Sequence, residues 1–163
     1  LYLLEERVAT PITIQAKRGY KYPAYATGIG KALLSGKTEK DIKTLYPEGL
    51  YKLTEHTIDD FDTLDYIDVV GDVTTFAGAM QTQKSGYSFE KEESNKDVQC
   101  IAVPVKYKEN VIAGMSVAVP VFYYSEEFEK KAMEELKKAK QHIEKLIQDN
   151  TQEWVYSPLG TET

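Results

Sequence analysis

Cysteine and histidine are scarce in this chain of 163 residues, which has one cysteine and two histidines. A single cysteine excludes an intramolecular disulfide, as is usual for proteins of the reducing cytosol. So few histidines and cysteines also argue against a zinc site built from these residues. We therefore expect a cytoplasmic protein, and we predict neither a metal ion nor another cofactor.

Long apolar runs and an excess of basic residues are missing as well. No run approaches the ~18 apolar residues of a membrane-spanning helix, and no signal-peptide pattern opens the chain. The 26 acidic and 20 basic residues give a formal net charge of -6, whereas direct binding of DNA or RNA needs a basic face. Any action on DNA would have to pass through another domain. The abrupt, strand-like start at Leu1 indicates a fragment of a longer polypeptide.

Two nucleotide-binding motifs are incomplete around Gly28. A P-loop needs Ser or Thr after its Gly-Lys pair to hold the magnesium ion, and Ala32 has no such oxygen. The dinucleotide fingerprint needs a third glycine where this chain has Leu33. Neither kind of nucleotide site is predicted.

The stretch 25–36 predicts a loop that leads into a short helix. Pro23 breaks whatever precedes it, Thr27 or Gly28 can cap the helix, and Gly36 is a natural stop. The first turn of a helix has unpaired backbone N–H groups at the positive end of its dipole and can therefore hold a small anion. The ordinary alternative is a helix start that binds only water.

Periodicity and turn residues predict the remaining elements. Helical patterns occupy residues 38–47, 73–84 and 125–148. Strand patterns occupy residues 1–6, 12–16, 98–107 and 111–119, and another strand begins at 86–89. This mixed order favours an α+β fold, an antiparallel sheet with helices packed on it. We expect one domain over residues 1–150, followed by a C-terminal tail over 151–163.

Three side chains in the second half of the chain are candidates for a binding or catalytic site. Cys100 and Ser116 lie in the two runs of a predicted hairpin, where both can face one cavity. Glu90 stands between a strand and a polar loop. Each also has an ordinary interpretation: a buried thiol, a backbone-bonded hydroxyl and a solvated charge. The acidic residues between 59 and 72 lack the ordered pattern of an EF-hand loop and are interpreted as a solvated surface.

Three segments resemble, in the same order, motifs of IclR-type transcriptional regulators. Pro23–Leu34 is similar to P-x-H-A-[ST]-x-x-G-K-A-[LF]-L. Gly86–Val105 is similar to G-Y-x-x-[DE]-x-E-E followed by [VR]-x-C-[IL]-A-[AV]-P-[IV], and Ala113–Pro120 to A-[AG]-[LIM]-S-[IV]-S-G-P. The matches spread over about residues 1–150, and together they are specific.

The resemblance implies an effector-binding domain of GAF-like architecture. In such regulators this domain follows a winged helix-turn-helix domain, and dimers commonly pair into tetramers. Here we expect the DNA-binding domain, and the first helix and strand of the effector domain, to be absent. Family effectors are usually small organic or aromatic acids. Carried over by position, the pocket comprises backbone N–H groups of Gly28 and Ile29 and the side chains of Glu90, Val98, Cys100 and Ser116.

Three positions depart from the family pattern. Tyr25 stands where histidine is common, Ala118 where many members have a second serine, and Glu90 is longer than the aspartate often found there. These changes alter polar contacts in and near the expected pocket. They therefore bear on the identity of the effector more than on the presence of a pocket.

We predict a ligand-sensing domain of a bacterial transcriptional regulator that has no catalysis of its own. It would bind a small carboxylate and pass its occupancy, through a homodimer or homotetramer, to a separate DNA-binding domain. Two alternatives stay open: an enzyme that uses Cys100 as nucleophile, and an oligomerisation module that binds no ligand. The reactivity of the thiol separates the first alternative from the regulator, because a nucleophilic cysteine needs a lowered pKa.

Overall fold

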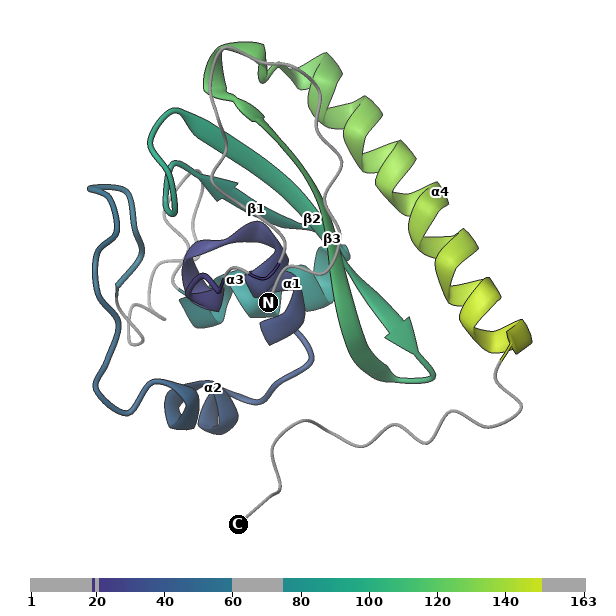
Figure 1. Ribbon diagram of the computed structural model, residues 1–163, viewed down its shortest axis with the longest axis horizontal. Coiled ribbons are helices and arrows are strands. Elements are labelled where there is room, and N and C mark those ends of the chain that lie inside the picture. Colours follow the sequence, from purple (N-terminus) through teal and green to yellow (C-terminus); the bar gives the residue numbers. More distant parts are fainter. Residues whose placement is uncertain (1–18, 20, 60–74, 151–163) are drawn as a thin grey trace.

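The computed structural model describes Gly19 and residues 21–59 and 75–150. Figure 1 shows that this part is an antiparallel sheet with helices on both faces, which confirms the predicted α+β class. The helices and strands are the 3₁₀ helix η1 (Ala24–Ala26), α1 (Gly28–Leu34), α2 (Glu39–Leu45), α3 (Thr75–Ser85), β1 (Ser88–Lys91), β2 (Val98–Tyr107), β3 (Asn110–Pro120), the 3₁₀ helix η2 (Val121–Tyr123) and α4 (Glu126–Asn150).

The strand β2 lies between β1 and β3 and is antiparallel to both. Opposite partners place Glu90 beside Cys100, and Ser116 beside Ala102. Because side chains alternate between the faces of a sheet, these four residues share one face. The other face includes Ile101, the residue between Cys100 and Ala102.

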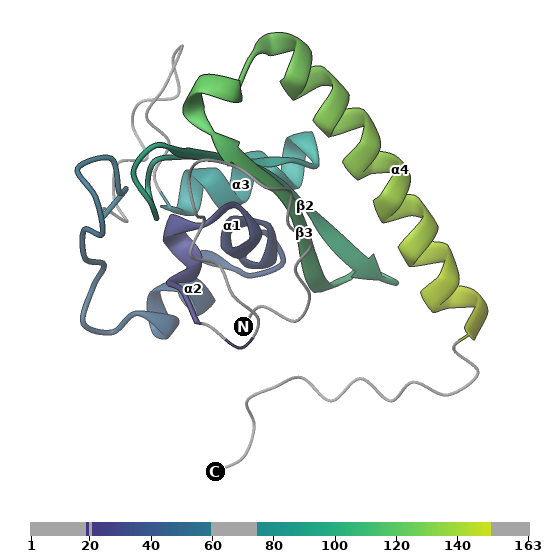
Figure 2. The ribbon, with the colours of Figure 1, turned by 45° about the horizontal axis from the view of Figure 1, so that its top comes forward.

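The helix α4 covers the second face of the sheet, as the views in Figures 1 and 2 agree. Ile101 and Val103 are buried there against Ala132 and Leu136. The helix is capped by Ser125, the first residue of the pattern that predicted it, whose Oγ accepts the N–H of Phe128 at 3.1 Å. These contacts make α4 the apolar support of the sheet. No helix of the described part is long and apolar enough to cross a membrane.

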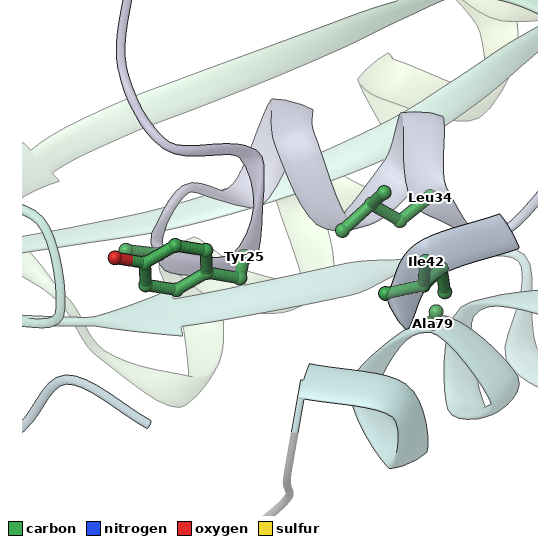
Figure 3. Packing of buried hydrophobic residues seen from close by; sticks show 5 residues of the cluster. Tyr25, Leu34, Ile42 and Ala79 are labelled. Atoms are coloured by element: carbon green, nitrogen blue, oxygen red, sulfur yellow. The ribbon is translucent and has the colours of Figure 1, made fainter. Parts of the chain in front are cut away.

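The helices α1, α2 and α3 form a second apolar cluster next to the first face. Its buried members include Tyr25, Leu34, Ile42 and Ala79 (Figure 3). Ile42 is placed by α2, which starts with a complete capping box at Thr38. Figure 3 shows the Tyr25 hydroxyl pointing away from the other three labelled side chains. That cluster packs α1 against α2 and α3.

Pro104 has no backbone N–H for a strand ladder, so a proline within β2 requires a bulge or an edge. It pairs with Gly114 on β3, and β1 reaches only as far as Ala102 on the other side. The register of the hairpin shifts just after it, between Val105 and Lys106. Pro104 therefore lies beyond the part of β2 that pairs with β1, and β1 requires no N–H from it.

Some of the predicted elements fall outside the described residues. These are the strands at 1–6 and 12–16, the first two residues of the helix at 73–84, most of the acidic stretch and the tail at 151–163. The strand that was expected to begin at 86 starts at Ser88. Gly86 instead has a φ of 80°, a turn conformation that suits glycine and ends α3.

Candidate ligand-binding site

The start of α1 lies directly on β2. Thr27, not Gly28, is the cap, because its Oγ1 accepts the N–H of Gly30 at 3.0 Å. A Cβ atom added at Gly28 would lie 2.8 Å from the sulfur of Cys100, and one at Gly30 would lie 2.1 Å from the carbonyl oxygen of Ala24. Both glycines are therefore required for the close approach of this turn to its neighbours.

Most of the residues predicted for the site meet on the face that α1 covers. Val98, Cys100 and Glu90 share that face, and Ser116 is diagonal to Cys100 across the hairpin. Ile29 differs, because its side chain turns to β3, where an added Cβ at Gly114 would lie 3.2 Å from its Cγ2. The side chain of Ile29 is thus a packing contact.

The thiol of Cys100 is enclosed by three of the other candidates. The Gly28 N–H and the Ser116 hydroxyl both lie near its sulfur, where each favours the charged form of the thiol. Burial, reinforced by the charge of Glu90, raises the pKa of Cys100 to about 12. A nucleophilic cysteine needs the opposite shift, so this environment does not suit the enzyme alternative.

Glu90 is buried, so the ordinary interpretation of this residue as a solvated charge is wrong. Its Oε1 accepts the N–H of Glu93 at 2.7 Å and the N–H of Ser94 at 3.0 Å. The carboxylate thereby closes the start of the loop between β1 and β2. Burial raises the pKa of Glu90 to about 7, against the lowering effect of the two N–H groups.

Lys31 and Glu93 are also buried charged residues, and the sequence did not predict them as part of the site. The Lys31 ammonium group forms an ion pair with Oε1 of Glu93 and donates to the carbonyl oxygen of Phe89 at 3.2 Å. Burial raises the pKa of Glu93, while the charge of Lys31 opposes this rise. The burial of Lys31 could have been inferred from its position three residues after Gly28. This spacing places both residues on one side of a helix that approaches the sheet closely.

Tyr25 stands where the family commonly has histidine. Its hydroxyl donates to the carbonyl oxygen of Tyr51 at 2.9 Å and accepts the N–H of Tyr51 at 3.2 Å. Its ring packs edge-on against those of Tyr46 and Tyr51. In this chain the position serves to hold the segment after α2 against η1.

A surface cavity of about 420 Å³ lies at the other end of α1. Its lining includes Gly36, Gln83 and the lysines Lys37, Lys106 and Lys140. None of the six residues predicted for the site lines this cavity. At the predicted site itself, the start of α1, Cys100 and Ser116 are packed against one another.

The antiparallel sheet with helices on both faces has a GAF-like α+β fold, which solved IclR-type regulators share. Residues 2–145 match the family model described as "Bacterial transcriptional regulator IclR C-terminal". The chain therefore belongs to the IclR family of transcriptional regulators, as the sequence motifs predicted.

Relatives with curated descriptions are regulators, not enzymes. Over 118 residues the chain is 32% identical to the HTH-type transcriptional regulator KdgR of Escherichia coli. The aligned stretch covers 71% of this chain and 41% of that relative. The chain thus spans less than half the length of the relative it matches. The crystal structure of the C-terminal domain of KdgR superposes with a TM-score of 0.65 at 28% identity, covering 78% of this chain and 73% of that one.

A second solved structure has a similar fold. It is a double mutant of the inducer-binding domain of the PobR transcription factor from Acinetobacter, in complex with 3-hydroxybenzoic acid. The TM-score is 0.64 at 24% identity, covering 85% of this chain and 75% of that one. This likeness concerns the fold.

Proposed function

We propose that this domain senses a small organic acid, which it binds between the start of α1 and the sheet. The observation that carries the proposal is the close approach of two potential donors, the Gly28 N–H and the Ser116 hydroxyl, to one buried atom, the sulfur of Cys100. A carboxylate placed there accepts a hydrogen bond from each of these donors. Such bonds are strong because the acceptor is charged.

Binding in this place requires a rearrangement of Cys100. Its sulfur stands in front of the Gly28 N–H, at a distance that leaves no room for even a methyl group on Gly28. The acid therefore binds a form in which the thiol has turned aside or α1 has moved off β2. A ligand that binds only this open form raises its population, which is how occupancy becomes a change of structure.

The change of structure has to reach DNA through other parts of a regulator. The relatives are named as HTH-type regulators and are more than twice as long as the stretch they share with this chain. With its net charge of -6, this chain is itself a poor partner for DNA. In our proposal the domain acts in the cytoplasm, forms a homodimer or homotetramer and sets the spacing of separate DNA-binding domains.

A thermal-shift screen tests the proposal. We name four acids as probes: glyoxylate, pyruvate, gluconate and 3-hydroxybenzoate, the last because the PobR domain was crystallised with it. An acid present at ~100 times its dissociation constant stabilises the folded domain by about 2.7 kcal/mol, which raises the melting temperature by several degrees. A rise with one acid and not with the others supports the proposal. No rise with any of the four favours the ligand-free oligomerisation module instead.

A further inference from the structure

Two carboxylates and one ammonium group are buried together beside the proposed acid site. Glu90, Glu93 and Lys31 are 2%, 6% and 3% exposed. Lys31 forms its ion pair with Glu93, and among the described residues the second oxygen of Glu93, Oε2, has no hydrogen-bond partner. A buried charge is stable only beside an opposite charge, and one ammonium group cannot balance two carboxylates. The cluster therefore favours one proton on a carboxylate.

The nearest groups around Glu90 identify where that proton resides. The loop after β1 presents Glu93, whose charge repels a charge on Glu90, and two N–H groups, from Glu93 and Ser94. The helix α1 presents Lys31, already paired, and β2 presents the neutral thiol of Cys100. Glu90 is thus the carboxylate without an ion pair of its own.

Within the described part of the chain, the other elements nearby add no charge that balances Glu90. The strand β3 has no titratable side chain and contributes Ser116. Lys84, the titratable residue of α3, is exposed. His56, in the segment that packs against the loop after β1, faces Glu92 with its Nε2 3.9 Å from Oε2. A proton taken from solvent is therefore what relieves the excess of negative charge.

We infer that binding of an organic acid at Gly28 is coupled to the uptake of one proton by Glu90, so that the domain responds to the acid and to pH together. The inference rests on the proposed function. An acid at this place adds a third negative group on the sheet face where Glu90 pairs with Cys100. Like charges that share a site disfavour ionisation of the weaker acid, and protonation of Glu90 restores the balance with Lys31.

The expected change of acid affinity with pH follows from the pKa of Glu90 in the ligand-free domain. The pKa of Glu90, about 7, places its titration at neutral pH. If the protonated form alone accepts the acid, the competent fraction falls from about 0.9 at about pH 6 to about 0.1 at about pH 8. The apparent affinity for the acid then falls about ten-fold between these two pH values.

Carbon-13 NMR of the glutamate side-chain carboxyl groups tests the coupling. The Glu90 signal is assigned by its absence in Glu90→Gln, which keeps a carbonyl oxygen for the N–H groups of Glu93 and Ser94 and so keeps the loop closed. It is followed from about pH 5 to about pH 9, first without ligand and then with each of the four acids. Glu109→Gln, at an exposed position of the hairpin turn, is the matched control.

The coupling predicts a midpoint near 7 for Glu90 without ligand, and an upward shift of about one pH unit or more with the acid that raises the melting temperature. It also predicts that Glu90→Gln binds that acid equally well at about pH 6 and about pH 8. An acid that raises the melting temperature but leaves the midpoint in place overturns the coupling and leaves the proposed function standing. If no acid changes either quantity, both fail. A ligand-free midpoint near that of ordinary glutamate also overturns the coupling.

Discussion

Gly28 allows α1 to touch the sheet at the sulfur of Cys100. We predict that Gly28→Ala lowers the free energy of unfolding by about 1–2 kcal/mol, because its methyl group would lie 2.8 Å from this sulfur. In a Cys100→Ala background the same change should have a much smaller effect, because the obstructing atom is gone. Urea unfolding of the four proteins measures this coupling. Strictly additive effects would show that the two residues do not share this contact.

Glu90 makes the stability of the domain depend on pH. Its pKa in the folded state, about 7, lies above the usual value of 4.5. The stabilising effect of its protonation is thus complete below about pH 4.5 and is lost as the pH rises through about 7. We predict that Glu90→Gln raises the free energy of unfolding by about 1–3 kcal/mol at about pH 8 and changes it little at about pH 5. Urea unfolding at both pH values measures it, and equal effects would contradict it.

At the scale of elements, the buried pair of Lys31 and Glu93 joins α1 to the loop between β1 and β2. We predict that Lys31→Met destabilises the domain by about 3–5 kcal/mol, because it leaves a buried carboxylate without its partner. Lys138→Met is the matched control: its pair with Glu134 is exposed, and its loss should leave the stability nearly unchanged. Thermal or urea unfolding compares the two. Similar losses of stability in the two variants would mean that burial does not determine how much an ion pair contributes to stability.

The same elements show which parts of the fold can be predicted from sequence. Thr38 and Ser125, the first residues of two predicted helices, cap α2 and α4, and the β2–β3 hairpin lies where the pattern places it. Both features are predictable because caps and turns depend on neighbouring residues. The burial of Lys31 and Glu93 could not be predicted in this way. It depends on how closely α1 approaches β1 and β2, which are distant in sequence.

The candidate site was predictable to a similar extent. Its residues on β1, β2 and β3 come together because register fixes the face of each side chain. Two features of the site could not be predicted: the side chain of Ile29 packs on β3, and the Cys100 sulfur lies next to the Gly28 N–H. Both depend on the tertiary packing of α1 on the sheet.

At the scale of the whole molecule, the two faces of the sheet differ in how they are expected to respond to a bound acid. One face is filled by apolar contacts with α4, whereas the other carries the polar site and α1. We predict that a bound acid slows amide hydrogen exchange in α1 and in the first half of β2, and leaves the middle of α4 unchanged. Exchange measured by mass spectrometry resolves these segments. Equal protection throughout would instead mean that the acid stabilises the domain globally.

The central claim is that an acid binds at the donors beside Cys100, and calorimetric titration of Ser116→Ala tests it most directly. The acid is the one from the screen that raises the melting temperature. We predict that Ser116→Ala weakens its binding by ~1 kcal/mol or more, about five-fold, because one charge-assisted hydrogen bond is lost. Ser125→Ala, at the cap of α4 on the opposite face, should bind the acid with unchanged affinity. Equal affinity in Ser116→Ala and the unmodified domain would contradict the assignment of this site.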